Sequence, residues 1–306
     1  KGPSGASRLE LFLPTGISAH IRPAPGGWHL LHLVPLARGS RLWAPLQAPL
    51  AVIALDAPEG PALAGLVGRL ASHRQDPPAL AADLLEALFG SWPVLVDAAA
   101  QDLLARPDLL RLAPPEAPAR ILALLRELPP SGAAARSLVH LAGTLAPTGW
   151  ASVLVEQAAA PGREELAPSI GSVLAFHLGE EAVHLLARRA GDPPNPGLLL
   201  ALGATRLPAA LPLLGKELAR TRGGSVIGPA LSLHRTRQAA ELLAAALAAC
   251  PAGEEEKARL LVEALAEMPI SHSRRLLAEV ARGGLAPAHA ERAALAIARR
   301  APGRGQ

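Results

Sequence analysis

The sequence predicts a mainly α-helical protein built from short helix pairs, with a small β-containing N-terminal portion. Half of the 306 residues are apolar, yet aromatic residues make up only 2% and Tyr is absent. The apolar content is almost entirely Ala, Leu and Val, and Ala and Leu favour helices, whereas strands favour aromatic and β-branched residues. A small-residue and leucine pattern also recurs near every 30 residues, which is typical of an α-solenoid.

Residues 1–58 are interpreted as the β-containing N-terminal segment. Short apolar or alternating runs such as RLELFL, WHLLHLV and LAVIAL are separated there by PTG, RPAPGG and LQAP, which is the pattern of strands and turns. Residues 59–115 are predicted to be a helical connecting region. Proline is tolerated in the first turn of a helix, so the 31 prolines are compatible with many short helices.

Residues 116–306 are predicted to be a solenoid of helix pairs. The segments FHLGEEAVHLL (176–186) and LHRTRQAAELL (233–243) share a His and a terminal Ala-x-x-Leu-Leu, which ATRLPAALPLL (204–214) retains. The small residues of successive units are separated by 31, 28, 29 and 34 positions: Ala151, Ala182, Ala210, Ala239 and Ser273. We expect the first leucine of each pair to face the shared core: Leu185, Leu213, Leu242 and Leu276.

These units resemble the HEAT-like repeat family, especially the short repeats named after the phycobilisome lyases. The resemblance covers roughly residues 116–301. It implies paired helices and a role in binding partners, but it implies no catalytic activity. An iron-dependent hydroxylase with similar repeats needs His-Glu dipeptides, which this chain lacks. HEAT-like DNA glycosylases need a basic groove with aromatic or acidic groups, and Trp150, at a helix start, is expected to pack rather than to stack on a base.

The segment FHLGEEAVHLL raises the question of a metal site, because it holds four potential zinc or iron ligands: His177, Glu180, Glu181 and His184. Gly179 is predicted to divide them, with His177 ending one helix and the acids opening the next, where the dipole favours carboxylates. The related unit keeps His234 but has neither acid. We therefore expect no metal, and we interpret His177 as a turn-capping or partly buried histidine.

Other chemical signatures are absent from the sequence. There is no GxxxxGK[ST] loop, GxSxG elbow or HExxH motif, so we predict no catalytic, cofactor-binding or metal-binding residues. The single cysteine, Cys250, excludes an intramolecular disulfide and is expected to be a buried thiol at a helix end. No membrane span is predicted. A cytoplasmic location is favoured, and we expect a segment upstream of Lys1.

The distribution of arginine residues indicates a candidate ridge for binding a partner. The pI is about 10.1 but the formal net charge is only +4, because nearly all cations are Arg, which scarcely titrates. Six arginines near successive turns form the candidate ridge: Arg188, Arg189, Arg220, Arg222, Arg235 and Arg237. Four acids are interleaved with them, which predicts mixed charge and at most weak nucleic-acid binding: Glu180, Glu181, Glu217 and Glu241.

The sequence thus favours a non-enzymatic protein-interaction scaffold or adaptor, with another protein as the partner on the concave face of the solenoid. Two alternatives stay open. A nucleic-acid-binding solenoid is favoured if the arginines line that face. A small-molecule enzyme or lyase is favoured only if ionisable residues from several repeats converge in one pocket.

Overall fold

The structure is a computed structural model of the chain, and it is mainly helical. It describes residues 10–11, 29–31, 33–35, 42–45, 52–54, 60–90, 93–128, 133–220 and 226–300. The remaining residues, which include Arg222 and most of the predicted β-containing segment, lie outside the described part. The chain divides into two units, residues 1–117 and 118–306, which are described separately below.

Unit 1 opens with short strands: β1 (Glu10–Leu11), β2 (His29–Leu31), β3 (Leu33–Pro35), β4 (Leu42–Pro45) and β5 (Val52–Ala54). Strand β4 pairs in parallel with β1 and antiparallel with β3. Strands β2 and β5 form a separate antiparallel pair, in which Leu30 lies opposite Ile53.

The helices of unit 1 follow these strands: α1 (Gly60–Ser72), η2 (His73–Gln75), α2 (Pro77–Phe89), α3 (Pro93–Ala105) and α4 (Pro107–Leu110). Helix α2 begins with Asp76 as its N-cap, whose carboxylate accepts a hydrogen bond from the Ala79 N–H at 3.3 Å. Proline occupies the first turn, where no intrahelical N–H bond is lost. Helix α2 packs on both α1 and α3, with Leu84 and Leu88 in the core.

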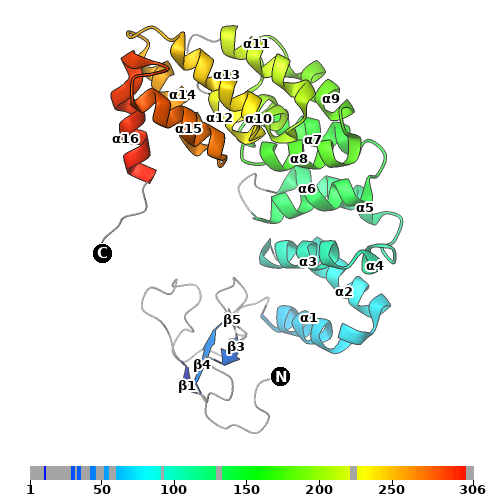
Figure 1. Cartoon of the computed structure of the whole chain (residues 1–306). Helices are drawn as coiled ribbons and strands as arrows, with labels where there is room; N and C mark the ends of the chain where they lie inside the picture. Colours follow the sequence, from blue (N-terminus) through cyan, green and yellow to red (C-terminus); the bar gives the residue numbers. More distant parts are fainter. Residues whose placement is uncertain are drawn as a thin grey trace. The chain divides into compact units, whose positions relative to one another are not determined.

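Unit 2 is a succession of short helices (Figure 1): α5 (Ala117–Glu127), α6 (Ala133–Leu145), α7 (Trp150–Ala159), α8 (Ala167–Leu178), α9 (Glu181–Ala190), α10 (Pro196–Thr205), η3 (Pro208–Ala210), α11 (Leu211–Arg220), α12 (Ile227–His234), α13 (Arg237–Ala248), α14 (Glu255–Glu267), α15 (Ser271–Ala281), η4 (Pro287–His289) and α16 (Ala290–Arg300). None of the described helices is both long enough and apolar enough to cross a bilayer.

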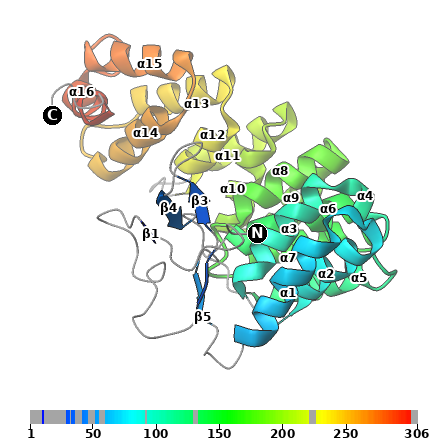
Figure 2. The same cartoon turned by 90° about the horizontal axis from the view of Figure 1, so that it is seen from below.

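Alternate helices of unit 2 pack on one another. Helices α6, α8, α10, α12 and α14 contact in succession, as Figure 2 shows for α8 to α14. On the other side, α7 contacts α9, α11 contacts α13, and α13 contacts α15. Each of α8, α10, α12 and α14 also packs on the helix that follows it. The helices therefore alternate between two layers with the apolar core between them.

The buried face of the second-layer helices corrects the predicted leucine register. In four units the small residue is completely buried. The second leucine of each of these units is also buried, with at most 3% of its surface exposed: Leu186, Leu214, Leu243 and Leu277. The first leucines are partly exposed instead, and Leu213 reaches 36%: Leu185, Leu213, Leu242 and Leu276. The prediction was therefore wrong by one residue.

Helix geometry explains this one-residue error. The fourth residue after the small one lies about 40° around the helix, whereas the third lies about 60° in the opposite direction. In three units the residue directly after the small one is buried too, as at Val183, Leu211 and Ala240, so the core lies on the side of the fourth residue. In the first unit Trp150 and Leu154 take the buried positions and Ala151 does not. Trp150 is 8% exposed, so its predicted packing role is confirmed.

Glycines allow the first-layer helices to approach closely. A Cβ added at Gly171 of α8 would collide with the backbone carbonyl of Ala201 in α10. The same collision would occur between Gly203 of α10 and the carbonyl of Ala230 in α12. Because only glycine lacks a Cβ, glycine at these two positions lets the backbones of α8 and α10, and of α10 and α12, come into direct contact. This packing agrees with a core dominated by small side chains.

Candidate interaction surface

The segment FHLGEEAVHLL turns at Gly179. Helix α8 ends at Leu178, Gly179 has φ +57°, and Glu180 is the N-cap of α9. The predicted division of the four polar residues between two helices is therefore confirmed. Within the described residues, no group of three or more His, Cys, Asp or Glu side chains is placed to hold a metal ion.

The predicted role of His177 is wrong, and its counterpart His234 takes that role instead. His234 is 1% exposed; its Nε2–H donates to the Leu207 carbonyl at 3.0 Å and its Nδ1 accepts from the Thr236 hydroxyl at 2.9 Å. Burial lowers the pKa of His234 below its usual value. Helix α12 ends at His234, whereas α8 continues past His177 to Leu178, and the His177 side chain is exposed.

His177 lies in an exposed aromatic cluster, which we call the Phe176 patch: His140, Trp150, Phe176 and His177. The His177 ring makes edge contacts with Trp150, at a centroid distance of 5.6 Å, and with Phe176, at 4.9 Å. Trp150 and Phe176 are the two residues among 118–306 that are Phe, Trp or Tyr. Trp150 is buried, whereas Phe176 is 85% exposed, the highest value among the large apolar side chains described.

Helix α6 supports the patch from the other side. The His177 ring lies against Gly143, where a Cβ would come within 3.1 Å of the ring. His140 lies one turn earlier on the same helix; burial and the nearby charge of His177 lower the pKa of His140. The Phe176 patch thus combines side chains from α6, α7 and α8. Sequence reasoning named Trp150 and His177 separately but gave no signal that they meet.

Three of the six ridge arginines have acidic partners in the structure. Arg188 pairs with Glu181 at 2.9 Å, and Arg237 pairs with Glu241 at 2.7 Å. The hydrogen bond from Arg237 is the main reason that the pKa of Glu241 lies below its usual value.

Arg220 is held by two acids at once. It contacts both carboxylate oxygens of Asp192 at 3.1 Å and reaches Glu217 at 3.2 Å. Among the described residues, Arg189 and Arg235 have no acidic partner, and Arg222 lies outside this part of the chain. Three of the four interleaved acids therefore pair with ridge arginines, as their spacing suggested.

A pocket of about 300 Å³ lies between α7 and α9, beside part of the ridge. Glu156, Leu185, Arg188 and Arg189 are among its lining residues. The partly exposed Leu185 therefore faces this pocket rather than the core. One acid and two arginines do not form a set of groups suited to acid–base or nucleophilic catalysis.

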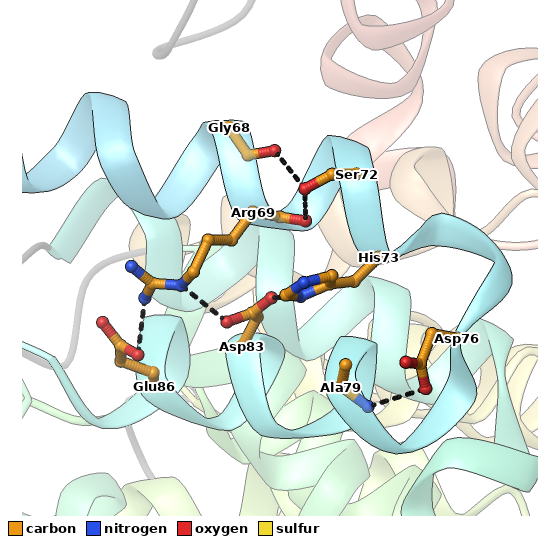
Figure 3. Close-up of polar contacts among 8 residues, drawn as sticks. All are labelled: Gly68, Arg69, Ser72, His73, Asp76, Ala79, Asp83 and Glu86. Atoms are coloured by element: carbon orange, nitrogen blue, oxygen red, sulfur yellow. Dashed lines mark hydrogen bonds and ion pairs between the residues drawn. The ribbon is translucent and has the colours of Figure 1, made fainter.

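Unit 1 contains a charge network around a buried aspartate, which sequence reasoning missed (Figure 3). Asp83 of α2 is 6% exposed and lies between Arg69, whose Nε is 2.9 Å away, and His73, whose Nδ1 is 2.7 Å away. Arg69 also binds Glu86 at 2.6 Å. Burial pushes the pKa of Asp83 upward, but the hydrogen bonds from Arg69 and His73 outweigh it and hold the pKa below its usual value.

This network is a connection between α1 and α2 rather than a catalytic group. An Asp–His pair becomes catalytic when the histidine activates a nucleophile. The nearest candidate, the Ser72 hydroxyl, donates instead to the carbonyls of Gly68 and Arg69 at 3.0 Å. The one available sequence signal was the four-residue spacing of Arg69 and His73, which places them on one side of the helical segment where α1 passes into η2.

A second feature of unit 1 is a mostly apolar cleft of about 1300 Å³, lined by α1 to α4. Its ionisable lining residues are Arg74, Asp102 and Arg106. Burial raises the pKa of the Asp102 carboxyl. Arg106 is engaged with Asp108 at 2.9 Å.

No protein-family model matches the chain, and comparisons with curated proteins and with solved structures found no match either. Function is therefore inferred from the geometry of this chain's own residues.

Proposed function

We propose that residues 118–306 form a HEAT-like α-solenoid that acts as a protein-interaction scaffold, with the Phe176 patch as a contact point. The observation that supports this most directly is the 85% exposure of Phe176 on a stack of alternating helix layers. Solenoids of stacked helix pairs present extended surfaces to partners. The finer assignment to short HEAT-like repeats is supported by the recurring buried pair of a small residue and a leucine.

The chemistry of the Phe176 patch suits a protein partner. Aromatic side chains dominate binding hot spots because they bury a large apolar area with few rotatable bonds. The edge contact with His177, whose ring also packs against Trp150, restricts where the Phe176 ring can lie. A ring that is ordered before binding loses less entropy on association.

The alternatives have weaker support. Binding to duplex nucleic acid needs arginines that neutralise phosphates, whereas Arg188, Arg220 and Arg237 are already paired with carboxylates. An enzyme needs converging ionisable groups, and the pocket between α7 and α9 brings together only one acid and two arginines.

The experiment is quantitative affinity capture with isotopic labelling, comparing the wild type with Phe176→Ser. Leu112→Ser is the matched control, because Leu112 is another large apolar side chain, 48% exposed. We expect one or a few proteins to be retained by the wild type and the control and lost with Phe176→Ser. The same loss with both variants, or no enriched protein with any of them, would contradict the proposal.

A further inference from the structure

The positive charge of this chain is concentrated in its last helices. Residues 269–306 contain seven arginines and two glutamates, whereas the rest of the chain contains 23 basic and 24 acidic residues. The formal net charge of +4 therefore derives entirely from the segment that includes α15 and α16.

Most of the described arginines of this segment lack the acidic partners that hold Arg188, Arg220 and Arg237. Four of them are exposed and have no acidic partner within the described residues: Arg274, Arg275, Arg282 and Arg299. A fifth, Arg292, reaches Glu255 at 3.7 Å. Arginines without carboxylate partners keep their five N–H donors available for a ligand.

An apolar groove adjoins these arginines. It has a volume of about 500 Å³ and lies where the end of α14 meets α15 and α16. Met268 and Leu277, both almost completely buried, contribute apolar lining, and Ile297 of α16 lines it with 39% of its surface exposed. Arg274 also lines the groove. A cationic group and an exposed apolar side chain therefore meet at one concave site.

We propose that this α14–α16 groove binds an acidic peptide segment of a partner protein. A carboxylate of the peptide pairs with Arg274, the arginine that lines the groove, since arginine binds carboxylates through two parallel hydrogen bonds. The exposed Arg275 next to it in α15 adds positive charge near the groove. An apolar side chain of the peptide enters the groove beside Ile297. Recognition of acidic motifs by clustered arginines is a general mode of peptide binding.

An acidic peptide fits this site better than nucleic acid does. A phosphate backbone offers no apolar group for Met268, Leu277 and Ile297. Glu267 also lines the groove and would repel a continuous row of phosphates. A peptide can present a carboxylate to Arg274 while placing an uncharged residue near Glu267. The site is distinct from the Phe176 patch, so the two proposals are tested by different variants.

The test begins with selection of short random peptides displayed on phage against the full chain. We expect the selected peptides to be rich in Asp or Glu and to carry at least one large apolar residue. Binding of one selected, fluorescently labelled peptide is then measured by anisotropy with three proteins. These are the wild type, Arg274→Glu with Arg275→Glu, and the control Arg111→Glu with Arg136→Glu, which changes the net charge equally at two other exposed arginines.

The proposal requires affinity to fall about tenfold or more with the Arg274 and Arg275 changes, and to change little in the control. Ile297→Ser should also weaken binding, and it tests the apolar half of the site without altering charge. Equal losses in both double variants would show general charge attraction and overturn the proposal. It is also overturned if no acidic peptides are selected, or if duplex DNA binds more tightly than the peptide through the same arginines.

Discussion

Helices α8 to α13 and helices α15 to α16 belong to the same unit, yet they use similar side chains differently. In α8 to α13, Arg188, Arg220 and Arg237 are paired with acids. In α15, at its C-cap and in α16, four exposed arginines have no acidic partner within the described residues, and Leu295 and Ile297 expose 53% and 39% of their surfaces. Residue type alone therefore does not indicate which arginines are available for binding.

Packing accounts for the difference between these two regions. Helix α12 has α10 on one side and α14 on the other, and it also contacts α11 and α13. Helix α16 packs on α14 and α15, and Ala293 is its one fully buried residue within the described side chains. A helix with neighbours on several sides buries its apolar residues, whereas α16 retains exposed ones.

The largest expected effect comes from the packed region. Leu214→Ala removes a completely buried leucine and should lower the free energy of unfolding by about 2–5 kcal/mol. Leu213→Ala is the matched control, because Leu213 is 36% exposed and should cost much less. Urea denaturation of both variants measures the difference. Equal losses would mean that the corrected leucine register is wrong.

The next largest effect tests the close approach of α10 and α12. Gly203→Ala places a Cβ against the Ala230 carbonyl and should destabilise the chain by about 1–3 kcal/mol. At Gly215 a Cβ would meet only the Leu242 methyls at 3.8 Å, so Gly215→Ala should stabilise its helix by about 0.5–1 kcal/mol. In thermal unfolding, the melting temperature should fall with Gly203→Ala and rise with Gly215→Ala. An unchanged melting temperature in Gly203→Ala would refute the close approach of α10 and α12.

A smaller effect should appear as pH dependence in the packed region. Burial lowers the pKa of His234, so the folded state keeps this ring neutral while the unfolded chain protonates it below about pH 6.5. Stability should therefore fall as pH drops below that value. In urea titrations across pH, His234→Gln should flatten this part of the profile. His184→Gln, a change at an exposed histidine, is the control, and an unchanged profile in His234→Gln would contradict the assignment.

The smallest expected effect concerns nucleic acid. Because the ridge arginines of α9, α11 and α13 are largely paired, labelled duplex DNA should bind weakly at low salt and lose most of that binding at physiological salt. Each phosphate contact contributes about −0.9 to the logarithmic salt slope. Tight binding that survives physiological salt and falls on Arg220→Ala or Arg237→Ala would favour the nucleic-acid alternative.

Local patterns in the sequence predicted much of the helical structure. The helix break at Gly179, the packing of Trp150 and the buried Cys250 follow from nearby residues, and the structure confirms them. The leucine register failed because two adjacent leucines give no sign of which one faces the neighbouring layer. That choice depends on where the next helix lies.

The candidate sites were harder to predict for the same reason. The Phe176 patch joins His140, Trp150 and His177 from three helices, and no local spacing links them. The α14–α16 groove likewise depends on the meeting of Met268 and Ile297. The concentration of positive charge in residues 269–306 can be read from the sequence. Which of these arginines pair with acids cannot be read from the sequence.

The central claim, that exposed arginines of α15 and α16 lack the carboxylate partners that hold Arg220, Arg237 and Arg259, is tested most directly by arginine footprinting. The chain is treated with a glyoxal reagent, and modification at each arginine is measured by mass spectrometry. We predict faster modification of Arg274, Arg275 and Arg299 than of Arg220, Arg237 and Arg259, the last of which binds Glu256 and Glu263. Equal rates in the two groups, or faster modification of the paired group, would contradict the claim.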